Sequence, residues 1–124
     1  RLTHQVHVYD IAGNEIGLIS QRLFTFLPTF DISVGGRPCG SIRKEFTFFK
    51  PSYSIEYGGW QCDGDFLSWN YSVTAGSRLV ANIAKQLLSW GDTYTLDISD
   101  PGDEIMALML VIAIDAVNCS QNNN

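Results

Sequence analysis

The longest apolar run lies near the end of the chain, where ten consecutive apolar residues extend from Ile105 to Ile114. As a helix, this segment has no polar face, so it must be enclosed by protein or by lipid. Ten helical residues span about 15 Å, half of the roughly 30 Å hydrocarbon core of a bilayer. Asp100 and Pro101 are typical of a helix start. We therefore predict a hydrophobic helix over about residues 101–118, buried in protein.

The residues before this helix alternate between apolar and polar in a pattern that repeats along the chain. Residues 13–32 and 36–55 align without a gap, and a third copy with one inserted residue covers residues 76–96. The second half of each copy alternates with a period of two, which is typical of half-buried antiparallel strands. Pro28 and Pro51 fall where one strand of a unit gives way to the next. We predict a repeated pair of strands and about nine strands in total.

This combination of elements predicts a mainly β fold. A meander of half-buried strands can curl into a closed antiparallel β-barrel, with the apolar helix running through its middle. The alternative is an open sheet packed on one side of the helix. That arrangement would leave about four or five large apolar side chains in water, at about 1.5 to 3 kcal/mol each. We favour enclosure, unless a partner chain covers the other side of the helix.

Composition narrows the class of protein. The chain has 124 residues, of which 45% are hydrophobic and 17% charged, enough for one core and a single domain over residues 1–124. Its net charge of -5 argues against a nucleic-acid binder that works by neutralising phosphates. Cys39, Cys62 and Cys119 lack the spacing of a zinc site or of a disulfide framework. We therefore expect a reducing, cytoplasmic setting.

Candidate catalytic and metal-binding groups are isolated in the sequence. His4 and His7 face opposite sides of a predicted strand, so they cannot act as a pair. The Asp63-Gly64 step predicts a hairpin turn, and Asp63 with Asp65 offers too few oxygens for calcium. We expect no enzymatic activity, metal or cofactor. The serines lack a nucleophile elbow: Ser68, Ser89 and Ser120. The acidic residues around the helix start suit helix capping, with a weak cation site as the alternative: Asp92, Asp97, Asp100, Asp103 and Glu104.

Three polar residues occupy the same place in the three repeat copies: Gln21, Lys44 and Lys85. Each lies between apolar residues on the apolar side of its predicted strand. In a barrel they would form a partial polar ring near one rim, where an anion or a lipid headgroup could bind. The alternative is that each marks a strand bulge or extends its polar end to water.

One stretch of the chain is locally basic. Arg37, Arg43, Lys44 and Lys50 lie close together in sequence, with Glu45 as the only acidic residue among them. At roughly 1 kcal/mol per basic residue near an anionic surface, this stretch predicts weak attraction to anionic phospholipids. The acidic remainder of the chain opposes that attraction.

Four segments resemble the LURP-one-related family: Val8-Tyr9-Asp10 with Gly13-Asn14-Glu15, residues 41–56, residues 64–73, and residues 85–98 before the apolar helix. The resemblance covers essentially the whole chain. It implies a fold similar to the tubby C-terminal domain and the phospholipid scramblases, a twelve-stranded barrel around a central hydrophobic helix. It also implies that about three strands precede Arg1, and that a chain without them would be unstable or oligomeric.

The function that we expect is binding rather than catalysis. The family has no established enzymatic activity, so the resemblance implies no catalytic residues. We predict an intracellular domain that binds an anionic phospholipid, a membrane surface or a protein partner, without a transmembrane segment. The alternative is a scramblase-like lipid-handling protein, or an enzyme with an unrecognised site.

Overall fold

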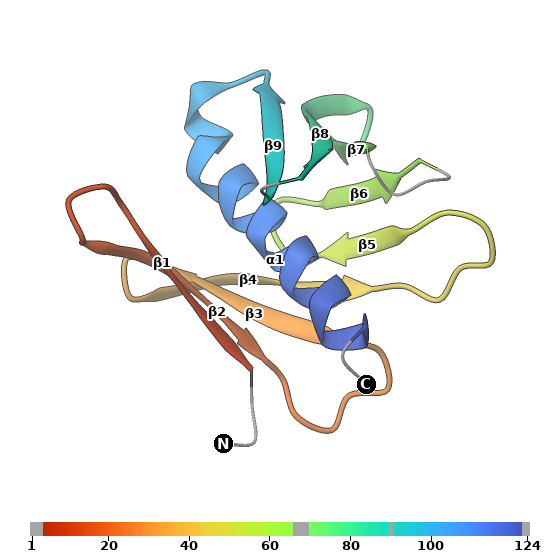
Figure 1. Cartoon of the computed structure of the whole chain (residues 1–124). Helices are drawn as coiled ribbons and strands as arrows, with labels where there is room; N and C mark the ends of the chain where they lie inside the picture. Colours follow the sequence, from red (N-terminus) through yellow and green to blue (C-terminus); the bar gives the residue numbers. More distant parts are fainter. Residues whose placement is uncertain (1–3, 66–69, 90, 123–124) are drawn as a thin grey trace.

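A computed structural model describes residues 4–65, 70–89 and 91–122. Nine strands form one antiparallel sheet in which each strand pairs with the next in the chain, and a short 3-10 helix leads into one α-helix (Figure 1). The elements are β1 Gln5–Tyr9, β2 Glu15–Gln21, β3 Thr29–Val34, β4 Arg37–Lys44, β5 Ser52–Ile55, β6 Trp60–Gly64, β7 Asn70–Ala75, β8 Arg78–Leu88, β9 Gly91–Ile98, η1 Pro101–Asp103 and α1 Glu104–Asn122.

The sheet curls around α1 without closing into a hydrogen-bonded barrel. Strand order runs from β1 to β9, and no ladder joins these two outer strands within the described ranges. The predicted closed barrel is therefore not confirmed. Closure by hydrogen bonds requires β1 and β9 to meet, directly or through further strands, whereas here both remain edges.

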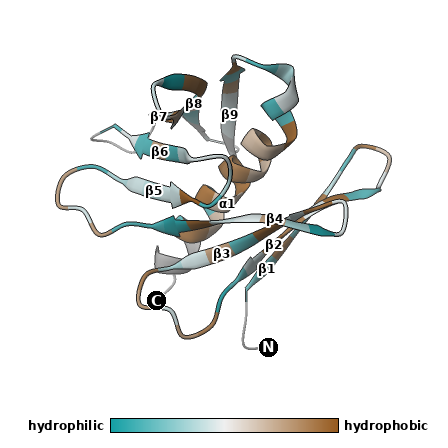
Figure 2. Ribbon diagram, turned by 180° about the vertical axis from the view of Figure 1, so that it is seen from behind, coloured by the Kyte–Doolittle hydropathy of each residue, from teal (hydrophilic) through white to brown (hydrophobic). Residues whose placement is uncertain are grey.

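The core lies between the concave face of the sheet and α1. Met109, Leu110 and Val117 of the helix are fully buried, as are Ile19 and Ile42 of the sheet. The visible middle part of α1 carries the brown colour of apolar residues in Figure 2. The helix contacts β2, β3, β4 and β9. The prediction of a hydrophobic helix as the centre of the core is thus consistent with the packing.

One stripe of α1 is less well covered. Ile105 is 43% exposed, and Leu108, Ile112 and Asp115 are half-buried, whereas the helical residues between them are buried. These positions lie three or four residues apart, so they share one side of the helix. Enclosure of α1 is therefore extensive but incomplete.

The helix begins as predicted and ends later. The Asp100 carboxylate accepts a hydrogen bond from the backbone N–H of Gly102 at 2.9 Å, and Pro101 occupies the first turn. The helical main chain then continues to Asn122, beyond the predicted end near residue 118. Once a helix is nucleated, each added residue gains a main-chain hydrogen bond without needing an apolar face.

The predicted turn at Asp63-Gly64 is wrong. Both residues belong to β6, where Gly64 pairs with Tyr71, and the preceding turn is made by Gly58 and Gly59, both with positive φ. A Cβ at position 64 would collide with the side chains of Pro51 and Tyr71. Gly64 is thus explained by close packing rather than by turn geometry.

Candidate functional site

Two loops at the same end of the sheet carry exposed aromatic side chains. Residues 22–28 join β2 to β3, and residues 45–51 join β4 to β5, so antiparallel pairing places both loops at one end (orange and yellow in Figure 1). Five phenylalanines on these loops are between 72% and 99% exposed: Phe24, Phe26, Phe46, Phe48 and Phe49. We call this group the aromatic rim.

Local interactions shape the two loops of the aromatic rim. Phe24 has a φ of 57°, a left-handed conformation that is rare and strained for a bulky residue. The Phe46 and Phe48 rings meet edge to face with centroids 5.2 Å apart. In the same loop, the Thr47 hydroxyl donates to the Lys50 carbonyl at 2.7 Å. The loops therefore hold large apolar side chains in water, which is unusual unless another surface covers them.

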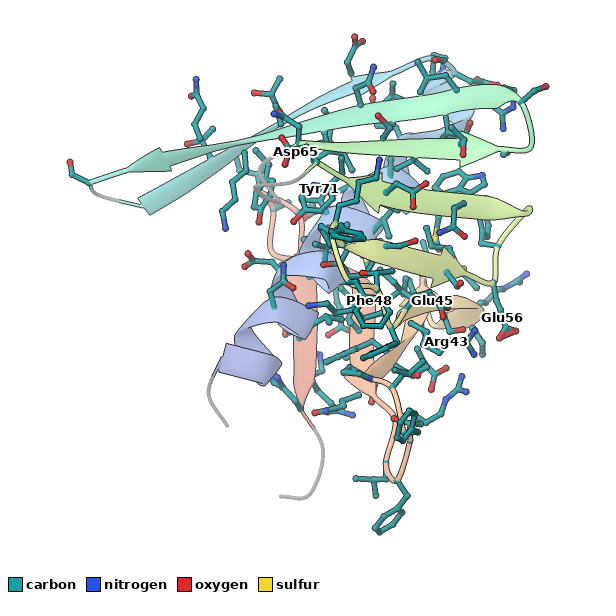
Figure 3. All side chains as sticks on the ribbon, turned by 90° about the vertical axis from the view of Figure 1, so that its right-hand side faces the viewer. Arg43, Glu45, Phe48, Glu56, Asp65 and Tyr71 are labelled. Carbon is teal, nitrogen blue, oxygen red and sulfur yellow. The ribbon has the colours of Figure 1, made fainter. Side chains whose placement is uncertain are left out.

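Two arginines lie at the base of these loops, on the outer face of the sheet. Arg22 Nη2 is 2.6 Å from Asp31 Oδ1, and Arg43 Nη2 is 3.0 Å from Glu45 Oε2. Figure 3 labels Arg43, Glu45 and Phe48, which lie in the same region of the molecule. A hydrogen bond from Ser54 and the neighbouring Arg43 lower the pKa of Glu45, so this carboxylate stays ionised and holds Arg43 in place.

An open depression lies between these two arginines and the first loop. Its volume is about 260 Å³, and it is lined by Arg22, Thr25, Phe26, Leu27, Thr29 and Arg43. The backbone N–H of Arg22 donates to the Thr29 carbonyl at 2.9 Å, and Thr29 pairs with Arg43 across β3 and β4. Arg22, Thr29 and Arg43 are thus neighbours across this end of the sheet.

The predicted polar positions Gln21, Lys44 and Lys85 occupy equivalent places on the inner face of the sheet. They pair with Phe30, Tyr53 and Tyr94 in three hairpins. In each hairpin this pair lies two residues along the strands from an apolar pair: Ile19 with Ile32, Ile42 with Ile55, and Ile83 with Leu96. None of the recorded register shifts falls at these positions, so the strand-bulge alternative is not supported there. Gln21 and Lys44 are instead the last residues of β2 and β4.

The two lysines of this inner group lie in different environments. Lys85 Nζ is 3.9 Å from Asp115 of the helix and 5.6 Å from the centre of the Tyr94 ring, while the Tyr94 hydroxyl donates to Asp115 at 2.8 Å. Burial lowers the pKa of Lys44. Lys85 therefore joins the sheet to the helix, which gives this position a structural role.

Tyrosines fix the last part of the helix on the same inner face. The buried Tyr53 hydroxyl donates to the Asn118 side-chain oxygen at 3.1 Å, and its ring meets Tyr71 at a centroid distance of 6.1 Å. Burial, with a smaller contribution from Tyr71, raises the pKa of Tyr53 strongly. Tyr53 is therefore a neutral hydrogen-bond donor at ordinary pH.

The locally basic stretch of the sequence does not form one patch. Arg37 begins β4 and Lys44 ends it, about 23 Å apart at roughly 3.3 Å per residue. Arg43 points to the outer face and Lys44 to the inner one, while Lys50 is exposed in the second loop. Strand alternation thus separates side chains that are neighbours in sequence.

The isolated polar residues have structural partners. His7 Nδ1 is 2.6 Å from Glu15, Asp63 accepts from the Ser52 hydroxyl at 2.8 Å, and Arg78 is 3.3 Å from Asp103. Within the part of the chain that the structure describes, no group of three His, Cys, Asp or Glu residues is placed to hold a metal ion. Ser68 lies outside the described residues, as do the side chains of Asp92, Cys119 and Ser120.

The sequence analysis missed the aromatic rim. Gln21 and Lys44 were expected between apolar residues of continuous strands, but β2 and β4 end at these two residues, and Phe46, which follows, is 72% exposed. Phenylalanine and threonine have high β propensity, so an aromatic loop resembles a strand in sequence. The signal that could have revealed the loops is Pro28 and Pro51, each directly before the next strand.

Comparisons with known proteins agree with the resemblance noted from the sequence. The model of the LURP-one-related family matches residues 1–115. The chain is similar to the uncharacterized protein YxjI of Bacillus subtilis (strain 168), with 32% identity over 116 residues, which cover 94% of this chain and 72% of the relative. No solved structure matches. The chain belongs to the LURP-one-related family.

Proposed function

We propose that this domain is a non-enzymatic module that binds the surface of a phospholipid membrane by inserting the aromatic rim. The observation that carries this proposal is the exposure of five phenylalanines on two neighbouring loops at one end of the sheet. Aromatic side chains are favoured where an apolar body meets a wet interface. We place this binding at the cytoplasmic face of a membrane, because the free Cys39 and Cys62 fit a reducing compartment.

Apolar insertion contributes more to this binding than charge does. Fully burying a phenylalanine is worth about 1.5 to 3 kcal/mol, whereas a basic residue near an anionic surface contributes about 1 kcal/mol. Arg22 and Arg43 are each paired with a carboxylate, and the whole chain carries a net charge of -5. Binding should therefore persist when salt screens the exposed charges.

The shape of the aromatic rim favours a membrane over a protein partner. Its side chains come from two separate loops that extend beyond the ends of the strands (Figure 1). The strained backbone at Phe24 holds a fully exposed ring at the first of these loops. Loops of this kind can enter a fluid interface without a complementary surface, whereas a protein partner would have to provide matching pockets.

The packing of α1 counts against the scramblase-like alternative in which the helix leaves the sheet to enter the bilayer. Met109, Leu110 and Val117 would lose their contacts, at about 1.5 to 3 kcal/mol for each side chain. Among the described segments, none is a helix with the length and apolar character needed to cross a membrane. The aromatic rim offers a route to the membrane that leaves the core intact.

The test is vesicle co-sedimentation with the double variant Phe24→Ser, Phe48→Ser. The matched control is Ile11→Ser, because Ile11 is fully exposed in the loop between β1 and β2, at the opposite end of the sheet. We expect the wild-type protein and the control to sediment with phosphatidylcholine and phosphatidylserine vesicles at low and high salt, and the double variant to stay in solution. Failure of the wild-type protein to bind at low salt, or equal loss in the control, contradicts the proposal.

A further inference from the structure

We infer that the depression between Arg22 and Arg43 is a binding site for the phosphate group of an anionic membrane phospholipid that presents a phosphomonoester. This inference rests on the proposed function, since insertion of the aromatic rim would bring the depression to the level of the headgroups. The predicted headgroup position on the inner face is thereby replaced by one on the outer face.

The hydrogen bonds of the two arginines leave donors directed away from their carboxylates. Arg22 uses Nε and Nη2 toward Asp31, and Arg43 uses Nε and Nη2 toward Glu45. In both residues Nη1 takes part in no hydrogen bond with the described residues. A guanidinium has five N–H donors in a planar fork that suits phosphate oxygens. Each arginine can therefore keep its ion pair and still donate to a ligand.

The carboxylates make the site selective rather than simply basic. Asp31 and Glu45 balance the charges of Arg22 and Arg43, and Glu56 adds a further negative charge near Arg22, so the site has no excess of positive charge. Binding then depends on directed, charge-assisted hydrogen bonds, which are shorter and stronger than neutral ones. A terminal phosphate offers more acceptor oxygens and more charge than the phosphodiester of other lipids.

The other residues that line the depression are partly polar and partly apolar. Thr25 brings a hydroxyl group, and Phe26 and Leu27 bring apolar groups beside it, whereas the Thr29 hydroxyl already donates to the Leu27 carbonyl at 3.0 Å. The volume of about 260 Å³ is several times the roughly 30 Å³ that one water molecule occupies in the liquid. Phe26 belongs to both the depression and the aromatic rim, so a lipid phosphate here would lie beside the inserted side chain.

The variants that test this site keep the net charge of the protein. One combines Arg22→Gln with Asp31→Asn, and a second combines Arg43→Gln with Glu45→Gln. The matched control is Arg78→Gln with Asp103→Asn, which removes a similar exposed ion pair that joins β8 to η1. Circular dichroism and thermal unfolding verify that each variant is folded.

The assay compares phosphatidylcholine vesicles containing phosphatidic acid with vesicles containing phosphatidylserine at equal surface charge. We expect the wild-type protein to bind phosphatidic acid vesicles about tenfold more tightly, and both arginine–carboxylate variants but not the control to lose this preference. Their binding to phosphatidylcholine vesicles alone should stay unchanged, since it depends on the phenylalanines.

Three outcomes overturn the inference. The first is a wild-type protein without preference for phosphatidic acid, and the second is a preference that survives in both variants. The third is saturation of the site by inorganic phosphate without vesicles, seen as NMR shifts around Arg22 and Arg43, together with no preference among vesicles. That result would assign the site to a soluble phosphate compound. Loss of all vesicle binding in the phenylalanine variant, by contrast, reports on the proposed function and not on this site.

Discussion

The burial of α1 makes a sharp prediction about which helix residues stabilise the fold. Leu110 is fully buried, whereas Ile112, two residues later, lies on the less covered stripe of the helix. Leu110→Ala removes about three methylene equivalents at about 0.8 kcal/mol each, or about 2.4 kcal/mol. The cavity left behind raises the total loss to about 2.7 to 5 kcal/mol, a large part of the roughly 5 to 15 kcal/mol typical of a domain.

The matched variant Ile112→Ala removes the same number of carbon atoms. Part of the Ile112 side chain is already in water and its loss leaves an open surface, so we expect less than half the effect of Leu110→Ala. Alanine is the best helix former, so neither variant loses helix propensity. The difference in unfolding free energy between the two variants therefore reports mainly the effect of burial.

Urea unfolding followed by tryptophan fluorescence measures both variants, since Trp60 is buried in the core. We expect the midpoint to fall much further for Leu110→Ala than for Ile112→Ala, with little change in the slope of the transition. Equal losses in the two variants would refute the placement of the open stripe. A negligible loss for Leu110→Ala would refute the helix as the centre of the core.

Two further predictions concern the sheet. Gly40→Ala places a Cβ against the Glu56 backbone carbonyl and should destabilise the fold by about 1 to 3 kcal/mol or more. Gly17→Ala meets mainly the flexible end of Met109, with the Ser33 carbonyl 3.1 Å away, and should cost less in urea unfolding. Burial raises the pKa of Cys62 to about 12, so its contribution to stability is complete below pH 9 and is lost as the pH rises toward 12. Between pH 9 and 10, the decline in unfolding free energy should be shallower for Cys62→Ser than for the wild type; parallel curves would contradict this.

The helix and the strands could be predicted from sequence because their patterns are local. An apolar run without a polar face, preceded by Asp100 and Pro101, has few alternatives to a buried helix. The registers of three hairpins agree with the aligned copies, since Ile19 pairs with Ile32, Ile42 with Ile55, and Ile83 with Leu96. Periodicity of two thus identified both the strands and their inward faces.

Closure of the sheet and the turn near β6 could not be obtained in the same way. Whether β1 meets β9 depends on contacts between the two ends of the sheet, which no local pattern reports. Asp63-Gly64 has the composition of a turn, but the space next to Pro51 and Tyr71 is what requires a glycine at position 64. In both cases tertiary packing overrides the local signal.

The residues of the candidate site could likewise be predicted from the sequence only in part. The sequence placed Gln21, Lys44 and Lys85 at equivalent inward positions, because strand alternation is regular. It did not identify Arg22, which lies just after β2 ends at Gln21 and lines the depression together with Arg43. The aromatic rim was missed for the same reason, since the length of a strand depends on its neighbours.

The central claim is tested most directly by the depth of the aromatic rim in a membrane. An environment-sensitive fluorophore is attached at Phe48→Cys or, as a control, at Ile11→Cys, in a background with Cys39→Ser and Cys119→Ser; the buried Cys62 thiol should not react. With vesicles, we predict that the label at position 48 shifts to the blue and is quenched by nitroxides in the acyl chains, while the label at position 11 is unaffected. No shift at position 48, or equal quenching at both positions, would contradict membrane insertion through the aromatic rim.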